Sequence, residues 1–403
     1  MVRLSLILPL YRKAWPLTSA VASRLDPLMP VEEEKTPDYH HDRFFPARPG
    51  QVLNQRYQLA TKLGYGANST VWLARDLHRW RWSEEKYIAV KINATASSSR
   101  KRSVENEVAI LQHISKLNPN HQGWHFIRKL SDSFNIEGKY GSSHCCLALD
   151  PLREPLWLYQ RRYSDGVIPS GILKVLVQMM LHALDCLHSE CRVIHTDLKP
   201  DNIMIKLEDL GLLEKDAQDE YDHPLPQKHI GDRIIYLSRN NFGPLRKPTG
   251  IIQLVDFDLS VSTKPGKLHF GPIQAEIYRA PEVILDSGYT FSADIWSLGV
   301  MLWDLLEGKS LFEPQNTNLV DEYDDATHLH LITYLIGPPP KEFSPNGQRS
   351  TIFYDSDGNL ISGEEKRRFI SFVKRMMKWR PEERSTAKEL LDDPWLHEDF
   401  LEE

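Results

Sequence analysis

From about residue 51 to residue 152, apolar residues occur in short runs separated by turn residues. Four stretches have the β-branched and aromatic composition of strands, namely RYQLATKLGYG, STVWLARDL, YIAVKIN and SSHCCLALD. Between the last two, the stretch SVENEVAILQHISKL repeats its apolar residues every three or four positions, which predicts an amphipathic helix. We therefore expect a small, mainly β lobe with one helix at 51–152.

After residue 153 the apolar spacing becomes helical. Three stretches carry the pattern: SGILKVLVQMMLHALDCLHSE, IWSLGVMLWDLLEG and GEEKRRFISFVKRMM. A further stretch, STAKELLDDPWL, begins with a serine that suits a helix N-cap. The sequence predicts an α+β chain, in which the small β lobe precedes a larger, mainly helical lobe at 153–403.

Two segments follow neither pattern. Residues 1–50 are rich in proline and charge, and we expect a partly disordered leader or linker there. Residues 206–250 are rich in Asp, Glu, Pro and Gly, and they interrupt the helical lobe as an insertion. A connection of this length is usually functional or partly disordered, so its order stays open.

Composition narrows the function classes. The chain has 403 residues and a net charge of −6, which gives no reason to expect nucleic-acid binding through a basic surface. Its four cysteines include no C-x-x-C pair, so neither a disulfide framework nor a zinc site is indicated, and a reducing compartment is the simplest interpretation. No run approaches the roughly 20 apolar residues of a membrane span, so no membrane partner is expected.

The N-terminus allows two interpretations. The basic residues Arg3, Arg12, Lys13 and Arg24 precede the first acid, Asp26. This basic, acid-poor composition is that of a mitochondrial presequence. A disordered leader with no targeting role is the alternative, and the residues do not separate the two.

The first candidate site is a glycine turn with the sequence Gly64-Tyr65-Gly66-Ala67-Asn68-Ser69-Thr70-Val71. Glycines here let backbone amides approach phosphate oxygens, although a plain hairpin is a common alternative. Farther on, Lys91 lies within the apolar strand YIAVKIN. Such a lysine either extends to solvent or faces phosphate beside a carboxylate. We favour Glu107 over Glu105 as that partner, since Glu107 shares the helix face of Leu111.

The strongest signal is VIHTDLKPDNIMI, a polar loop between two short apolar strands at 193–205. Its residue types are those that phosphoryl transfer requires. Asp197 can accept a hydroxyl proton, Lys199 can neutralise a moving phosphate, and Asn202 can hold a metal ion. Singly, each would be an ordinary polar loop residue, but the combination at these spacings indicates a catalytic loop.

From about Tyr57 to Leu396 the chain resembles a eukaryotic protein kinase. The motifs, in chain order, are GYGANSTV, AVK, the Glu107 helix, HTDLKPDN, DFD, YRAPEV, SADIWSLG and a late Arg384. Lys199-Pro200 is typical of serine/threonine kinases. HTD in place of HRD, together with YRAPEV and DRIIYLSRNNFGPL, is most similar to the SR-protein-kinase-like enzymes of fungi, within the cyclin-dependent and MAP-kinase group.

This resemblance implies a bilobal protein-kinase fold, ATP and Mg²⁺ as cofactors, and Ser or Thr hydroxyls of proteins as acceptors. Asp197 would be the catalytic base assisted by Lys199, while Asn202 and Asp256 would hold magnesium. The residues implied to bind ATP are Leu63, Gly64, Gly66, Val71, Ala89, Lys91, Glu107, Leu149, Asp150 and Leu152. Three further residues have structural roles: Glu282 would pair with Arg384, and Asp294 would support the catalytic loop.

Two departures concern regulation. Thr196 replaces the arginine that binds a phosphorylated activation loop in many kinases, and the segment 260–274 is short. We expect activity that does not depend on loop phosphorylation. In LVDFDLS, Asp258 stands where the Asp-Phe-Gly turn has its glycine, so the freedom of this hinge is in question, although Asp tolerates unusual backbone angles.

A third group of departures concerns the substrate. SR-protein kinases bind arginine-rich tails in an acidic groove, and Lys309 in GKSLF occupies a position that is aspartate in those enzymes. Thr327 and Tyr334 indicate that a second acidic pair is also altered. Arginine/serine-rich protein substrates are thus a family expectation that this sequence weakens.

Three function classes were compared. A pseudokinase that acts as an ATP-binding scaffold usually lacks one of the residues Lys91, Glu107, Asp197, Asn202 and Asp256, all of which are present here. A small-molecule kinase is disfavoured by YRAPEV and SADIWSLG, which build a peptide platform. We expect an active, monomeric protein kinase, cytoplasmic or nuclear, with mitochondria as the alternative location.

Overall fold

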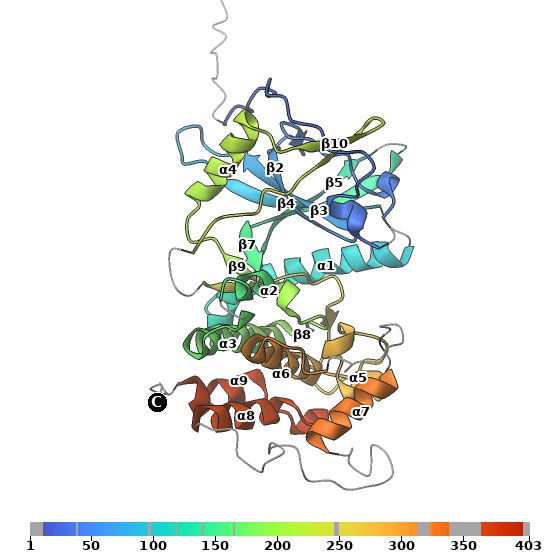
Figure 1. The fold of residues 1–403 in the computed structure, drawn as a ribbon, viewed down its shortest axis with the longest axis vertical. Helices are drawn as coiled ribbons and strands as arrows, with labels where there is room; N and C mark the ends of the chain where they lie inside the picture. The colour runs from blue at the N-terminus through green and yellow to red at the C-terminus, as the bar shows by residue number, and fades with distance from the viewer. Residues whose placement is uncertain are drawn as a thin grey trace, which may run out of the picture. The chain divides into compact units, whose positions relative to one another are not determined.

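The computed structural model describes residues 11–397 except 38, 96–97, 118, 139–140, 164–165, 246–249, 313–322, 324 and 338–363. The first residues of the expected leader, 1–10, lie outside this range. The chain forms two compact units (Figure 1). Unit 1 contains Met1–Ser115, Lys129–Arg153 and Lys206–Arg246, and unit 2 contains Lys116–Arg128, Glu154–Ile205 and Lys247–Glu403.

Unit 1 is built on an antiparallel sheet of six strands in the order β1-β2-β3-β4-β6-β5. These strands are β1 (Val52–Leu53), β2 (Tyr57–Gly66), β3 (Ser69–Asp76), β4 (Tyr87–Asn93), β5 (Leu130–Glu137) and β6 (Ser143–Leu149). The helix α1 (Ser98–Lys116) follows β4, as the periodicity predicted. The glycine turn joins β2 to β3, so its position is set by the register of this hairpin.

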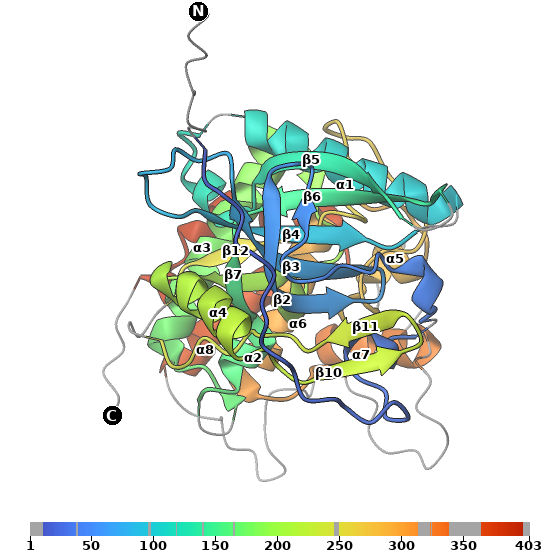
Figure 2. The same ribbon diagram turned by 90° about the horizontal axis from the view of Figure 1, so that it is seen from above.

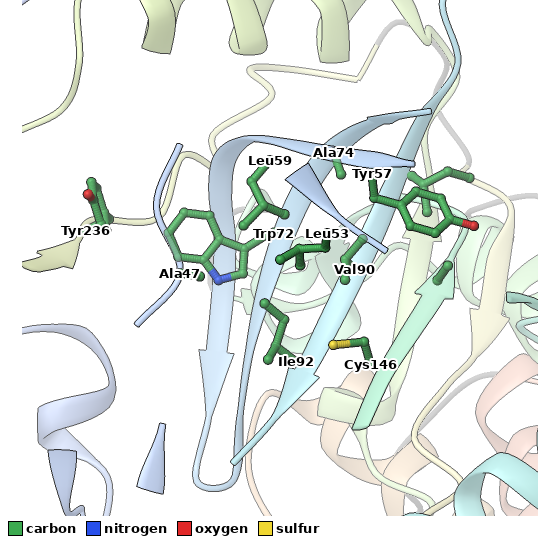
Figure 3. Close-up of a cluster of buried hydrophobic side chains, with 12 residues drawn as sticks. Ala47, Leu53, Tyr57, Leu59, Trp72, Ala74, Val90, Ile92, Cys146 and Tyr236 are labelled. Carbon is green, nitrogen blue, oxygen red and sulfur yellow. The ribbon is translucent and has the colours of Figure 1, made fainter. Parts of the chain in front are cut away.

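Both faces of this sheet are covered. One buried cluster contains Ala47, Leu53, Tyr57, Leu59, Trp72, Ala74, Ile88, Val90, Ile92, Cys146, Ala148 and Tyr236 (Figure 3). A second cluster contains Ala60, Leu73, Tyr87, Leu213, Ala217 and Phe242. Consecutive strand residues such as Leu59 and Ala60 belong to different clusters, because successive side chains point to opposite faces of a sheet.

The segment Lys206–Arg246 supplies part of both clusters. It forms the helix α4 (Gly211–Asp222) and a hairpin of β10 (Gln227–Ile230) and β11 (Arg233–Tyr236). Figure 2 shows α4 and the hairpin beside the sheet of unit 1. From the sequence, this segment was expected to be an insertion of the helical lobe. Its apolar residues pack on β2 and β3 instead, and this burial groups the segment with unit 1.

The leader is held to unit 1 by buried charges. Lys62 on β2, whose side chain is only 1% exposed, is paired with Glu33 of the turn η1 (Glu32–Lys35). Lys228 on β10 contacts Glu34 of the same turn at 2.8 Å. A buried charge is tolerated when it is paired and hydrogen-bonded. Each of these ion pairs therefore holds a leader glutamate against the strand that carries the lysine.

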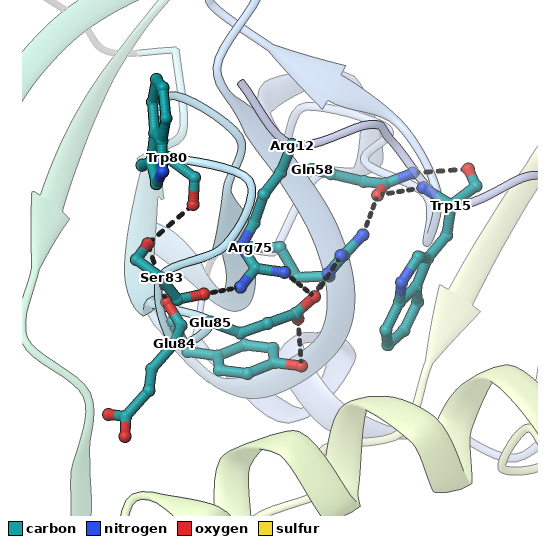
Figure 4. A network of polar contacts seen from close by, with 9 residues as sticks. Arg12, Trp15, Gln58, Arg75, Trp80, Ser83, Glu84 and Glu85 are labelled. Atoms are coloured by element: carbon teal, nitrogen blue, oxygen red, sulfur yellow. Dashed lines mark hydrogen bonds and ion pairs between the residues drawn. The ribbon is translucent and has the colours of Figure 1, made fainter. Parts of the chain in front are cut away.

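A second network holds the start of the described leader (Figure 4). Glu85 accepts hydrogen bonds from Arg75 at 2.6 Å and from Arg12 at 2.9 Å. Gln58 on β2 accepts a hydrogen bond from Arg75. Gln58 also accepts the backbone N–H of Trp15 at 2.8 Å and donates to the carbonyl of Trp15 at 2.9 Å. Arg12 and Trp15 of the leader therefore have specific bonding partners in unit 1.

Unit 2 is mainly helical. Its longer helices are α3 (Ser170–Asp185), α6 (Ser292–Glu307), α7 (Asp325–Ile336) and α8 (Glu364–Met376), and its short ones are α2 (Leu156–Gln160), α5 (Pro281–Ile284) and α9 (Ala387–Leu391). Two strand pairs frame its polar loops: β8 (Val193–Ile194) with β13 (Val261–Ser262), and β9 (Ile203–Lys206) with β12 (Ile252–Leu254). The strand β7 (Leu152–Pro155) precedes α2.

Helix α3 and its continuation to Cys191 form the long helix that the periodicity predicted, and by length and composition they could cross a membrane, which the sequence did not lead us to expect. However, 56% of the most apolar window is buried inside the structure. Since the buried residues include Leu173, Leu176, Val177 and Met180, this is the pattern of a core helix.

Asp216 on α4 generates a pH-dependent prediction. Its Oδ2 is buried and has no hydrogen-bond partner among the described residues. Burial raises the pKa of this carboxyl to about 6. The folded protein therefore loses stability as the pH rises from roughly 4, the ordinary value, towards 6. We expect Asp216→Asn to raise the free energy of unfolding by about 1 kcal/mol at pH 7.5, and by much less at pH 4.5.

The measurement is denaturant unfolding of the full chain at both pH values. Glu214→Gln, a substitution at an exposed carboxylate on the same helix, is the control and should show no such pH dependence. An equal effect of Asp216→Asn at both pH values would contradict the role of burial.

Candidate active site

One buried carboxylate holds the backbone of the polar loop between β8 and β9. Asp294, in the first turn of α6, is fully buried and accepts the backbone N–H of His195 at 2.8 Å and of Thr196 at 2.9 Å. His188 contacts the same carboxylate at 2.9 Å. Burial alone would raise the pKa of Asp294, but the bond and charge of His188 outweigh it and lower the pKa, so the carboxylate stays ionised.

This anchoring holds a strained backbone. Thr196 has a φ of 69°, in the left-handed region that β-branched residues rarely adopt. Such strain costs about 1–3 kcal/mol and persists only where surrounding bonds over-determine the conformation. The two amides on Asp294 provide that constraint, immediately before Asp197.

Asp197, Lys199 and Asn202 form one hydrogen-bonded group. The ammonium of Lys199 lies 2.7 Å from Oδ2 of Asp197, and Nδ2 of Asn202 donates to the same oxygen at 2.9 Å. Burial would lower the pKa of Lys199, but its bond to Asp197 and the nearby charges of Asp201 and Asp256 raise it. The group therefore combines an oriented carboxylate, which can accept a proton, with a permanent positive charge.

Asn202 and Asp256 can also offer oxygen ligands to a cation. Nδ2 of Asn202 also donates to the carbonyl of Asp197 at 2.8 Å, so both of its bonds to Asp197 use the amide nitrogen. Asp256 follows β12 directly and supplies a carboxylate. Amide and carboxylate oxygens suit Mg²⁺, so this donor set fits a magnesium ion. Among the described residues, the only cluster of three His, Cys, Asp or Glu ligands is the exposed group His40, His41 and Asp42 in the leader.

The backbone of the turn at 256–258 corrects one expectation. The residue with positive φ is Asp256, at 64°, and not Asp258. From the sequence, the need for unusual backbone angles was expected at the third residue of this turn. Because Asp258 does not have a positive φ, its backbone does not require glycine. Phe257 between them is fully buried with its ring 5.1 Å from that of His195.

A set of contacts that the sequence analysis missed holds the following segment in place. Gln274, also at a positive φ of 66°, donates its backbone N–H to the carbonyl of Thr196 at 2.9 Å. Its buried side chain donates to Ser297 and accepts from Ala280, both within 2.9 Å. The hydroxyl of Thr196 donates to Leu259 at 2.8 Å. The only sequence signal was a polar residue shortly before the buried YRAPEV stretch.

Glu282 and Arg384 form the ion pair that the resemblance implied. The guanidinium contacts both carboxylate oxygens, at 2.5 and 2.7 Å, and both side chains are fully buried. Removing one partner of such a pair typically costs about 3–5 kcal/mol, because it leaves a buried charge. This pair supports unit 2 and does not take part in chemistry.

In unit 1, Lys91 on β4 meets Glu107 on α1. The ammonium lies 2.8 and 3.0 Å from the two carboxylate oxygens, and the Glu107 side chain is 3% exposed. Glu107 is the partner favoured over Glu105. The strand register sets Val71 opposite both Gly64 and Lys91, and Ala89 opposite Leu149.

The remaining residues expected to bind ATP also belong to unit 1. Leu63 lies near the end of β2, Asp150 follows β6 and is exposed, and Leu152 on β7 is buried. All ten of these expected residues thus lie within one unit. Asp197, Lys199, Asn202 and Asp256 lie in the other.

The two glycines of the turn are not required by the fold itself. A Cβ at Gly64 would meet nothing within 4 Å, and at Gly66 it would meet only Ser69, at 3.6 Å. Neither glycine has a positive φ. Since neither packing nor backbone angle demands glycine here, the missing side chains fit close approach by a ligand such as a phosphate chain.

Comparison with known proteins agrees with this geometry. Residues 57–396 match the protein kinase domain. A serine/threonine protein kinase of Aspergillus fumigatus is 37% identical, covering 92% of each chain, and the serine/threonine-protein kinase SRPK of Physarum polycephalum is 29% identical with the same coverage. The human SRSF protein kinase 3 is 24% identical over 91% of this chain and 90% of its own.

The fold is also found among solved structures. A crystallised kinase domain superposes with a TM-score of 0.61 at 24% identity, covering 88% of this chain and 99% of that domain. At this identity the likeness shows the fold, which is the bilobal protein-kinase fold expected from the sequence.

The turn at 256–258 yields a prediction about backbone strain. At residue 256, glycine should give a more stable protein than alanine by about 1 kcal/mol, since only glycine adopts positive φ freely. At residue 258 the order should reverse, with alanine more stable by about 0.5–1 kcal/mol. The four variants carry alanine or glycine at residue 256 or 258, and all of them lose a carboxylate. Each alanine–glycine difference therefore reports the backbone contribution to stability at that residue.

Denaturant midpoints of the four variants provide the measurement. A larger benefit from glycine at residue 258 than at residue 256 would show that the hinge lies at Asp258 after all.

Proposed function

Because the chain belongs to the protein kinase family and is a serine/threonine protein kinase, we propose that Asp197 is its catalytic base and that arginine/serine-rich proteins are its substrates. The observation that carries the first part is the carboxylate of Asp197, held by Lys199 and Asn202 on a loop anchored to Asp294. A carboxylate oriented in this way can take the proton of an incoming Ser or Thr hydroxyl.

ATP would supply the phosphoryl group, and magnesium held by Asn202 and Asp256 would neutralise its charge. Lys199 would balance the negative charge that gathers beside Asp197. In unit 1, Lys91 would bind phosphate oxygens, oriented by Glu107, while the glycine turn covers the nucleotide. The absence of any packing or backbone need for Gly64 supports this assignment.

The residues that decide the scaffold alternative, Lys91, Glu107, Asp197, Asn202 and Asp256, are all present, and Asp258 is the remaining departure. A third residue that needed left-handed angles would be a reason to expect a damaged metal turn. Asp258 does not adopt such angles, so this departure gives no support to loss of catalysis.

Independence from loop phosphorylation is supported by Thr196 and Gln274. These residues tie the segment after Asp256 to the catalytic loop through hydrogen bonds of 2.8 and 2.9 Å. Pairing of β13 with β8 adds a further restraint. Because these bonds need no phosphate, the segment has its support before any modification.

The substrate proposal rests on relatives. The kinases named SRPK and SRSF protein kinase 3 align with this chain over 91% or more of its length. Against this, Lys309 is exposed, and the segment after β13 carries the exposed Lys264 and Lys267. Positive charge repels arginine, so the preference for arginine/serine peptides is expected to be weaker than an acidic groove would give.

The test measures magnesium-dependent transfer from labelled ATP to an arginine–serine repeat peptide and to a matched glutamate–serine peptide, after phosphatase treatment of the full chain. Phosphatase-treated protein should retain its activity and prefer the arginine peptide. Asp197→Asn should lower kcat by about 100- to 10,000-fold through loss of the base.

Asp201→Asn, which removes an exposed carboxylate of the same loop, should leave kcat within about threefold and serves as the control. Preference for the glutamate peptide would overturn the substrate proposal. Full activity of Asp197→Asn would overturn the assignment of the base, and loss of activity after phosphatase would overturn loop independence.

A further inference from the structure

We propose that Arg43 is a positioning residue for ATP binding, which acts from outside the matched kinase domain by holding the tip of the glycine turn. This inference rests on the proposed role of the turn over the nucleotide. Arg43 belongs to the leader turn η2 (His41–Arg43), and the family match begins only at residue 57.

The contact is direct. Nη2 of Arg43 donates to the side-chain oxygen of Asn68 at 2.7 Å. Asn68 lies at the tip of the turn, between Gly66 and Ser69, which face each other in the hairpin register. A single side chain from a distant segment therefore reaches the part of the turn that is expected to lie over phosphate.

The backbone beside this contact forms a second link. The carbonyl of Arg43 accepts the N–H of Thr95 at 2.7 Å, and the carbonyl of Asn68 accepts the N–H of Ala94 at 2.8 Å. Residues 94 and 95 follow β4, the strand that carries Lys91. Arg43 thus joins the tip of the turn to the end of the lysine strand.

Arg43 is itself held firmly. The next residue, Phe44, is 2% exposed, and Ala47 belongs to the buried cluster of the sheet. Arg233 on β11 donates to the carbonyls of His41 and Phe44, on either side of Arg43. The β10–β11 hairpin therefore supports η2 through Arg233, and η2 supports the tip of the glycine turn through Arg43.

Apart from the bond between Asn68 and Ala94, the side chains of the tip are open to solvent. Tyr65, Ala67 and Asn68 are exposed, and the glycines give the backbone wide freedom. Restricting the tip before ATP arrives reduces the ordering that binding must supply, which improves affinity. Because one exposed hydrogen bond is worth little, we expect a change of about 3- to 10-fold in KM for ATP and no loss of chemistry.

The experiment compares Arg43→Ala, Asn68→Ala and the double variant with wild type, by kinetics and by the Kd of a fluorescent ATP analogue. Each single variant should raise KM and Kd about 3- to 10-fold with kcat within twofold, and the double variant should be no worse than either single. Arg43→Lys keeps one donor and should recover part of the affinity. Arg48→Ala removes a leader arginine that bonds Asp232 instead, and it should leave ATP binding unchanged.

An unchanged KM and Kd in Arg43→Ala, or fully additive effects in the double variant, would overturn the proposal. Asn68→Ala alters no buried residue, so it tests the contact even if Arg43→Ala is unstable. If wild type transferred no phosphate, the proposed function would fail, while the Kd values would still decide the role of Arg43.

Discussion

The arrangement of the candidate active site depends on one buried carboxylate. Asp294 takes two consecutive backbone amides of the catalytic loop and one histidine, with no exposure to solvent. An ionised carboxylate in such a place is stable only because all three donors are present. The two amide bonds hold Thr196 in a left-handed conformation, directly before Asp197.

Strain is concentrated close to this point. Thr196, Asp256 and Gln274 all have positive φ, and Gln274 is bonded to the backbone of Thr196. Each alone would relax to an ordinary conformation, since left-handed angles are costly for residues other than glycine. Thr196 and Gln274 connect the loop after β8 with the segment that follows Asp256 by neutral hydrogen bonds. This explains how the chain can support these elements with threonine where many kinases have a phosphate-binding arginine.

Local patterns in the sequence were enough to predict the main strands and helices of both units and the grouping of Asp197, Lys199 and Asn202, but not β5, α4 or the β10–β11 hairpin. Their spacing lies within one loop, and the pairing of Lys91 with Glu107 follows from a strand and the next helix. The leader contacts could not be predicted, because Glu33 and Lys62, or Arg43 and Asn68, are distant in sequence and carry no shared pattern. The backbone angles at 256–258 were also hidden, since residue type indicates tolerance of a conformation but not which residue adopts it.

The most direct test of the central claim is amide hydrogen exchange over residues 193–199 in Asp294→Asn, measured together with kcat. Asparagine keeps the size of the side chain but has a single acceptor oxygen and no charge, so it cannot hold both amides. We predict a folded protein with faster exchange in this loop and a kcat lowered by at least about 100-fold, with little change in the Kd for ATP. Unchanged exchange and unchanged kcat would contradict the account, because the loop would then hold its form without the carboxylate.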